Sequence, residues 1–257
     1  MGGYLDSPPL VLAHRGGVAL PANAGIEGSV RAIGNAVALG ITYIEVDARA
    51  SADGEAFAFH DPDLRRVVRS ASDPTAQFAT LTAEQIRSHP LDGGEQVATI
   101  AELLAAFPTI RFNIDVKTAE VIAPTVRAIE DAGAHDRVLL ASFSHRRLMA
   151  ARKLLPGVAS SASPREIAAL WLGRGPVRSL GRRHGAVCFQ VPELYRDRRV
   201  VTPGFIAAAH ARDQQVHVWT VDEPDDINRL LDAGVDGLIT DRPDVVREVL
   251  EQRGQWR

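Results

Sequence analysis

The chain has 257 residues, 46% of them hydrophobic and 24% charged, which is typical of a globular protein and argues against a disordered one. Its formal net charge of −3 argues against a duplex nucleic-acid binder, because such proteins usually carry a basic face. The length allows a large buried core and fits one large α/β domain or two small ones.

The number of cysteines and the N-terminal sequence indicate the cellular compartment of the protein. The single cysteine, Cys188, cannot form an intramolecular disulfide and is typical of a reducing compartment. The N-terminal residues contain no basic region followed by an apolar core, and no apolar run approaches membrane-spanning length. We therefore expect a cytoplasmic protein without stable membrane insertion and without a nucleic-acid partner, and the sequence leaves its oligomeric state open.

The first half of the chain alternates between strand and helix patterns. In order, we predict a strand at Leu10–Ala13, a helix at Glu27–Leu39, strands at Tyr43–Ala48 and Ala56–Phe59, and a helix at Thr99–Phe107. Gly40 ends the first helix, and Thr99 with Glu102 forms a capping box at the start of the second. Residues 62–97 are polar and rich in turns, which predicts a long insertion of the kind that is more often functional than idle.

The second half continues the alternation to the end of the chain. We predict strands at Ile110–Val116, Val138–Ser142, Gly157–Ser161, Ala186–Val191, Val216–Val221 and Val235–Thr240, and helices at Ala123–Ala132, His145–Leu155, Pro164–Trp171, Pro203–Arg212, Asp225–Ala233 and Pro243–Gln252. Together with the two strands at Leu10 and Tyr43, this makes about eight main strands, most of them followed by a helix. The pattern favours a single (β/α)8 TIM barrel, as one domain over residues 1–257, rather than a doubly wound open sheet.

In a TIM barrel the active site forms at the C-terminal ends of the strands. Glu45 and Asp47 share one face of the strand Tyr43–Ala48, because strand residues alternate between two faces. Two buried carboxylates this close repel each other, so they are protonated, paired with cations or bound to a metal.

Other strand ends add polar groups to the same end of the barrel. His14 and Arg15 follow the first strand, His60 follows the short strand, and Asp115 shares a face with Lys117 at the end of another. We expect these side chains to converge on one barrel mouth. Their oxygen-rich set suits a hard cation such as Mg²⁺ or Ca²⁺ rather than zinc.

Each of these residues also has a purely structural interpretation. A single histidine is more often structural than catalytic, a strand carboxylate more often belongs to a salt bridge, and Lys117 can simply neutralise Asp115. A set of salt bridges does not require two histidines at strand ends as well. The joint pattern therefore favours a reaction site.

Five segments form a set of motifs in order along the chain. They are His14-Arg15-Gly16-Gly17, Glu45-Val46-Asp47-Ala48, Ala52-Asp53-Gly54 with Phe59-His60-Asp61, Asn113-Ile114-Asp115-Val116-Lys117, and Trp219-Thr220-Val221 leading to Gly237-Leu238-Ile239-Thr240-Asp241-Arg242-Pro243-Asp244. Together they resemble the glycerophosphodiester phosphodiesterase family from about residue 10 to residue 250. The first segment combined with the His60 segment is specific to that family.

The resemblance implies a TIM barrel with a small insertion after the second strand region. It implies hydrolysis of small-molecule glycerophosphodiesters to sn-glycerol 3-phosphate and an alcohol, with a divalent metal that is Mg²⁺ or Ca²⁺, or alternatively Mn²⁺. The residues that match by position are His14 and His60 as catalytic histidines, Glu45, Asp47 and Asp115 as metal ligands, Arg15 and Lys117 as phosphate contacts, and Trp219 as an aromatic wall for glycerol.

Two positions depart from the family pattern. The family often has Pro-Glu-Asn-Thr after the first strand, and here Gly25-Ile26-Glu27-Gly28-Ser29 keeps the Glu, while Pro21-Ala22-Asn23 is a rival alignment that loses it. We favour Glu27 as a substrate-side residue because it opens the predicted helix. Asp115 stands where many members have Glu, which moves the carboxylate by about one bond.

For the mechanism, we expect one histidine to act as general base and the other as general acid on the leaving alkoxide, with His14 favoured as base and His60 as acid. The base activates either water or the glycerol hydroxyl of the substrate. Two alternatives are the same chemistry on lysophospholipids or another phosphodiester, and a barrel that binds a phosphoester without cleaving it.

Overall fold

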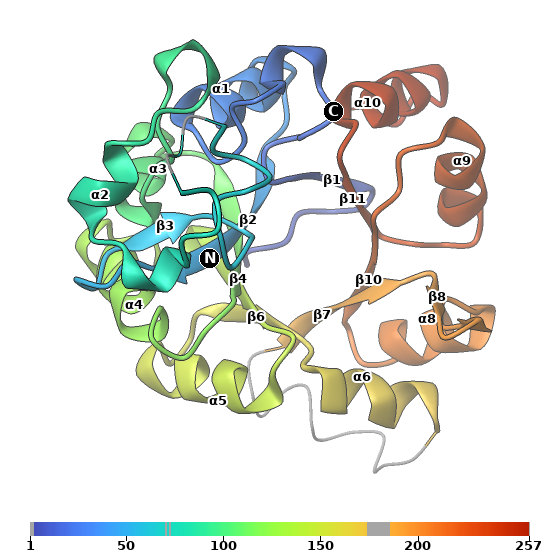
Figure 1. Ribbon diagram of the computed structural model, residues 1–257. Helices are drawn as coiled ribbons and strands as arrows, with labels where there is room; N and C mark the ends of the chain where they lie inside the picture. The colour runs from blue at the N-terminus through green and yellow to red at the C-terminus, as the bar shows by residue number, and fades with distance from the viewer. Residues whose placement is uncertain (1–2, 70, 72, 174–185, 257) are drawn as a thin grey trace.

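In the computed structural model, which describes residues 3–69, 71, 73–173 and 186–256, eight parallel strands close into a barrel (Figure 1). They are β1 (Leu10–His14), β2 (Tyr43–Ala50), β4 (Arg111–Val116), β5 (Val138–Ala141), β6 (Ala159–Ser161), β7 (Ala186–Pro192), β10 (Gln215–Trp219) and β11 (Gly237–Thr240). β1 pairs with both β2 and β11, which closes the ring. The predicted (β/α)8 TIM barrel is confirmed.

Helices surround the barrel (Figure 1). They are α1 (Val30–Ala38), α3 (Ile100–Ala106), α4 (Ile122–Asp131), α5 (His145–Leu154), α6 (Pro164–Trp171), α8 (Pro203–His210), α9 (Pro224–Asp232) and α10 (Pro243–Gln252). Five of them follow a residue whose hydroxyl accepts a hydrogen bond from a first-turn amide, namely Ser29, Thr99, Ser144, Ser163 and Thr202. The capping box predicted at Thr99 and Glu102 is confirmed.

The first helix begins later than predicted, and the expectation that Glu27 opens it is wrong. α1 starts at Val30, after its cap Ser29. Gly28 has a φ of +79°, and a Cβ there would lie 2.4 Å from the carbonyl oxygen of Ala58. The chain therefore turns sharply at position 28 before a helix can form, and only glycine fits this close approach.

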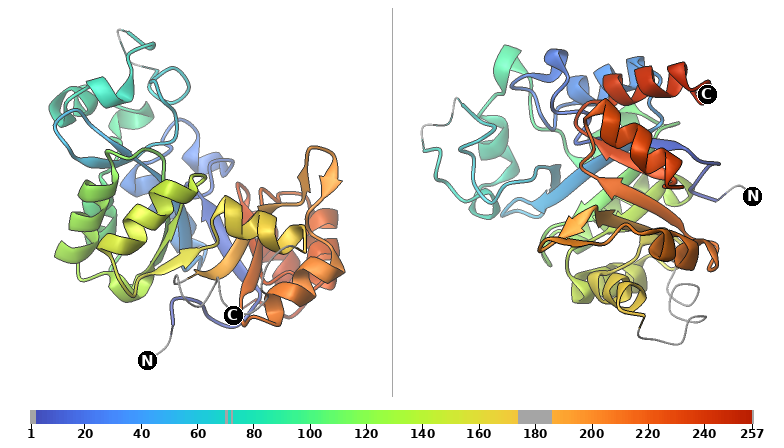
Figure 2. Two further views of the ribbon diagram at one scale, coloured as in Figure 1. Left: turned by 90° about the horizontal axis from the view of Figure 1, so that it is seen from below. Right: turned by 90° about the vertical axis from the view of Figure 1, so that its right-hand side faces the viewer.

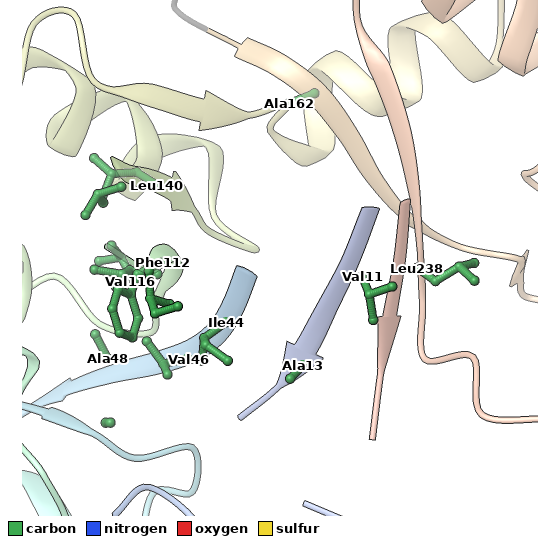
Figure 3. Packing of buried hydrophobic residues seen from close by; sticks show 14 of the residues in the cluster. Val11, Ala13, Ile44, Val46, Ala48, Phe112, Val116, Leu140, Ala162 and Leu238 are labelled. Carbon is green, nitrogen blue, oxygen red and sulfur yellow. The ribbon is translucent and has the colours of Figure 1, made fainter. Parts of the chain in front are cut away.

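The barrel strands divide their side chains between two apolar layers. Side chains that point outward, among them Val11, Ile44 and Val46, pack between the strands and the helices (Figure 3). Inward-pointing side chains such as Leu12 and Tyr43 form a second cluster inside the barrel. The alternation predicted along β2 is therefore confirmed, and its inward face leads to the carboxylates.

The insertion is a small packed unit and not a loose excursion. It contains η2 (Phe78–Thr80), α2 (Ala83–Arg87) and η3 (Asp92–Gly94), and it follows β3 (Ala56–Ala58), which pairs antiparallel with β2. Phe59 and Phe78 stack with ring centroids 4.4 Å apart in an apolar cluster that is separate from the barrel core. This packing fixes the segment over one side of the barrel.

The insertion and a short hairpin project from the end of the barrel opposite the N-terminus (Figure 2). The hairpin consists of β8 (Leu194–Tyr195) and β9 (Arg198–Arg199) and was not predicted. Both segments flank the C-terminal ends of the strands, where the active site of such a barrel forms. In the described part of the chain, no helix has the length and apolar character needed to cross a membrane.

Candidate active site

A cavity of about 800 Å³ opens at the C-terminal ends of the barrel strands. Its wall contains most of the predicted site residues, which are His14, Arg15, Glu45, Asp47, His60, Asp115, Lys117 and Trp219. Glu27 is the one predicted residue outside this wall. The cavity therefore brings together eight residues that are spread over more than 200 positions of the chain.

The strand register places the carboxylates side by side. β2 and β4 pair in parallel, with Asp47 opposite Asp115, and His14 on β1 lies opposite Glu45. Adjacent strands lie about 4.8 Å apart, so side chains on the same face of these positions are neighbours. All three carboxylates are buried, with 3% to 7% of their surface exposed.

Two fixed cations neutralise Asp47. Lys117 Nζ lies 2.7 Å from Asp47 Oδ1 and 2.6 Å from Asp115 Oδ2. Arg15 Nε lies 2.8 Å from Asp47 Oδ2, as an ion pair without hydrogen-bond geometry. Burial raises the pKa of Asp47, but Lys117 and Arg15 outweigh it, so that the pKa lies below its usual value.

Among the described residues, Glu45 has no comparable partner. The backbone amide of Arg15 donates to it over 3.3 Å, and His14 Nε2 lies 3.8 Å away. Burial and the negative charge of Asp47 raise the pKa of Glu45 to about 8. Ion pairing alone thus explains Asp47 but leaves Glu45 without a neutralising charge.

The donor set fits a divalent cation. Ligand atoms of His14, Glu45 and Asp47 lie within 4.8 Å of one another. Asp115 is outside this close group, but its Oδ1 is buried and has no hydrogen-bond partner among the described residues. Carboxylate oxygens that are buried, crowded and incompletely paired are the ligands that Mg²⁺ and Ca²⁺ prefer.

Each histidine of the cavity is held by a carboxylate. His14 Nδ1 lies 2.6 Å from Asp241 Oδ1, and His60 Nδ1 lies 2.7 Å from Asp61 Oδ1. Burial lowers the pKa of His14, but the bond to Asp241 and the charge of Glu45 outweigh it and raise the pKa above its usual value. The carboxylates fix Nδ1 as the protonated nitrogen, so Nε2 is the atom available for proton transfer.

A chain of charges joins the insertion to the barrel mouth. Arg66 of the insertion lies between Asp61, which its Nε contacts at 2.6 Å, and Glu27, which its Nη2 contacts at 2.8 Å. Glu27 in turn lies 3.3 Å from Arg15 Nη1. Glu27 therefore reaches the site through Arg15 and not through the cavity wall.

Three residues at the site, Asp61, Arg66 and Asp241, were not predicted from the sequence. Asp61 and Asp241 lie within the quoted motifs, and both follow a strand end, which is the rule that had selected His14. Arg66 carries no such signal, because its position depends on how the insertion folds. Its two partners are 5 and 39 residues away along the chain.

Asn23 and Trp219 complete the set of residues singled out from the sequence. Asn23, from the rival alignment, is buried, and its Nδ2 donates to the carbonyl oxygens of Gly16 and Gly17 at 2.9 Å each. It therefore fixes the loop that carries His14 and Arg15. Trp219 lines the cavity and meets Phe143 edge-on, with ring centroids 5.6 Å apart.

Comparison with known proteins finds similarity along almost the whole chain. The model of the glycerophosphoryl diester phosphodiesterase family matches residues 14–245. A Mycobacterium tuberculosis protein named "Probable glycerophosphodiester phosphodiesterase 2" is 41% identical over 254 residues, which are 96% of this chain and 92% of that protein.

Solved structures share the fold at lower identity. A glycerophosphodiester phosphodiesterase from Parabacteroides distasonis has a TM-score of 0.77 at 21% identity and covers 97% of this chain and 99% of its own. An Oleispira antarctica phosphodiesterase, solved in complex with the product sn-glycerol-3-phosphate, has a TM-score of 0.76 at 20% identity and covers 95% of this chain and 97% of its own.

Proposed function

Because the chain belongs to the glycerophosphoryl diester phosphodiesterase family, we propose that its cavity hydrolyses glycerophosphodiesters to sn-glycerol 3-phosphate and an alcohol. One observation carries this proposal: two histidines, each oriented by a carboxylate, share one cavity with three buried carboxylates. A protein that only bound a phosphoester would not need an acid and a base together.

The carboxylates of Glu45, Asp47 and Asp115 would hold a divalent cation, for which Mg²⁺ and Ca²⁺ are the first candidates and Mn²⁺ the third. The burial of Glu45 supports this assignment, because its nearest ion-pair partner among the described residues is His14 Nε2, at 3.8 Å. When bound, the cation supplies positive charge that offsets the charge of the phosphodiester and of its transition state.

The side chains of the cavity perform the proton transfers. His14, held by Asp241, acts as general base and takes a proton at Nε2 from water or from the glycerol hydroxyl of the substrate. The hydroxyl route would release the alcohol and form a cyclic phosphate, which water then opens to sn-glycerol 3-phosphate. His60, held by Asp61, acts as general acid and protonates the leaving alkoxide. Arg15 and Lys117 contact the phosphate oxygens, and Trp219 contacts the glycerol carbons.

The proposal is tested by offering the purified protein glycerophosphocholine, glycerophosphoethanolamine and glycerophosphoglycerol with Mg²⁺, Ca²⁺ or Mn²⁺. We expect release of sn-glycerol 3-phosphate and the free alcohol, because protonation by His60 is directed at the alcohol oxygen. Release of phosphocholine and glycerol would show that the other ester bond is cut. No product from any substrate with any metal would overturn the proposal.

A further inference from the structure

We infer that the side of the cavity formed by α6 and the β8–β9 hairpin is a subsite for an apolar alcohol. This inference rests on the proposed function and names the substrate class. Two groups of described residues in the cavity wall differ in chemical character. The charged groups come from β1, β2, β4 and the end of β3, whereas the α6 and hairpin side is formed by Ile167, Ala168, Trp171, Pro192, Tyr195 and Val200.

The sequence of α6 explains why this side is apolar. The helix starts at Pro164, and Ile167, Ala168 and Trp171 follow at a spacing that places them on one face. All three are partly exposed, and all three line the cavity. The residues by which α6 lines the cavity are therefore aliphatic or aromatic, and none of them is charged.

The indole nitrogen of Trp171 is hydrogen-bonded within the protein, so the ring is available for apolar contacts in the cavity. Its Nε1 donates to the carbonyl oxygen of Arg199 over 3.2 Å. Its ring meets that of Tyr195 edge-on, at a centroid distance of 6.3 Å and an angle of 90°. Trp171 and Tyr195 thus join the helix to the hairpin through an aromatic contact at the cavity wall.

The polarity of the two ends of a glycerophosphodiester indicates whether glycerol or the alcohol contacts the apolar α6 side. Glycerol carries two free hydroxyls that need hydrogen-bond partners. The charged side of the cavity offers such partners, and Asn113 on β4 adds a side-chain amide there. Among the described residues of the cavity wall, the α6 side contributes no carboxylate for a cationic headgroup. The substituent that gains from contact with Ile167, Pro192 and Val200 is an apolar chain on the alcohol.

The size and exposure of the cavity agree with such a substituent. A volume of about 800 Å³ is in the range that encloses a drug-sized ligand. Tyr195 and Phe143, both in the wall, are 50% and 64% exposed. Covering this apolar surface by substrate is favourable in proportion to the area removed from water.

The test uses sn-glycero-3-phospho-n-alkanols carrying ethanol, butanol, hexanol or octanol, below their micelle-forming concentrations, with glycerophosphocholine for comparison. We expect kcat/KM to rise with chain length, by up to about fourfold for each methylene that becomes fully buried. A flat or falling series, with glycerophosphocholine still hydrolysed, would overturn the subsite and leave the proposed function intact. A loss of all hydrolysis would overturn both.

A second experiment moves the apolar group from the alcohol to the glycerol end of the substrate. Glycerophosphoethanol acylated on glycerol with a chain of matched length carries the same apolar group on the retained glycerol. We expect it to be hydrolysed less efficiently than the matching alkanol ester. The reverse order would assign the apolar surface to glycerol and overturn the inference.

Two substitutions test the surface directly. Ile167→Ser and Tyr195→Ser are expected to reduce the increase of kcat/KM with chain length, Ile167→Ser by at least half. The matched control is Leu154→Ser, because Leu154 is also 50% exposed but lies on α5 outside the cavity wall. Circular dichroism confirms that each variant is folded. If kcat/KM rises with the length of the alcohol as steeply in both folded variants as in the wild type, the inference is contradicted.

Discussion

The carboxylate on Nδ1 of each histidine determines what its Nε2 can do. Asp241 and Asp61 accept from the two rings at 2.6 and 2.7 Å, so both imidazoles are held in one tautomer and one orientation. The side chain of His14 is 19% exposed and that of His60 is 35% exposed. His60 is the more exposed of the two, which agrees with its proposed role of protonating the alcohol as it leaves.

His60→Ala tests the acid role. We expect kcat on glycerophosphocholine to fall by about 10²–10⁴-fold, because the choline alkoxide is a poor leaving group that needs a proton. On a p-nitrophenyl ester, whose leaving group needs none, the loss should be much smaller. His14→Ala, which removes the base, should impair both substrates alike. Near-normal turnover of glycerophosphocholine by His60→Ala would show that the acid is another group.

We propose that Arg66 positions Asp61, whose Oδ2 its Nε contacts at 2.6 Å. Arg66→Gln removes the cation that fixes this carboxylate, and kcat on glycerophosphocholine should fall by about tenfold. The loss should again be smaller on the p-nitrophenyl ester, and Arg66→Lys should recover part of it. The control is Arg65→Gln, since the neighbouring Arg65 side chain is 64% exposed and contacts only Asp63 among the described ion pairs. Equal kinetics for the Arg66 and Arg65 variants would contradict this role.

A buried ion pair joins α5 to α6, one of the helices that line the cavity. Arg152 Nη1 lies 3.1 Å from Glu166 Oε1, and the two side chains are 8% and 7% exposed. Arg152 also donates to the carbonyl oxygen of Ser161 at the end of β6 over 2.7 Å. The pair therefore fixes the helix that carries the apolar side of the cavity.

Glu166→Gln should lower the free energy of unfolding by about 3 kcal/mol, because it leaves Arg152 as a buried charge without a counter-ion. The control is Glu251→Gln, which breaks the exposed pair with Arg247 on α10 and should cost less than about 1 kcal/mol. Guanidinium denaturation at pH 7 measures both. Equal effects would mean that the α5–α6 pair contributes no more than a surface contact.

The elements show what local sequence can and cannot predict. Strand alternation and cap residues are local, so the eight barrel strands and the capping box at Thr99 were predictable. The start of α1 was not, because Gly28 must turn under the Ala58 carbonyl, which lies 30 residues further along the chain. The β8–β9 hairpin was missed because its two-residue strands carry almost no periodic signal.

The interior of the barrel contains a histidine that is uncharged in the folded protein near neutral pH. His217 on β10 is fully buried, and its Nε2 lies 3.0 Å from Gln215 Oε1 while its Nδ1 lies 3.5 Å from Gln190 Nε2. The neutral tautomer with hydrogen on Nε2 satisfies both amides. Burial lowers the pKa of His217 to about 3.

This histidine makes stability depend on pH. The unfolded chain binds a proton at His217 below about pH 6.5 and the folded chain does not, so stability is lost as the pH falls from 6.5 toward 3. The contribution amounts to about 2 kcal/mol between pH 7 and pH 5. His217→Gln should reduce the loss of stability over this range by that amount, and the exposed control His135→Gln should not. Parallel pH profiles for wild type and His217→Gln would contradict this account.

The site was predictable to the extent that strand ends converge in a barrel. His14, Glu45, Asp47, Asp115 and Lys117 follow from that rule alone. The partner of His14 lies 227 residues away, and Arg66 reaches Glu27 across 39 residues, so these contacts depend on the closed ring and on the folded insertion. No local pattern contains them.

We propose that the buried carboxylates of Glu45, Asp47 and Asp115 hold a divalent cation that phosphodiester hydrolysis requires. The most direct measurement follows sn-glycerol 3-phosphate release from glycerophosphocholine after EDTA treatment, and then during titration with Mg²⁺ or Ca²⁺. We predict that EDTA abolishes release, that the added metal restores it to saturation, and that Asp47→Asn requires far more metal. Undiminished release in EDTA, in wild type and in Asp47→Asn, would contradict the claim.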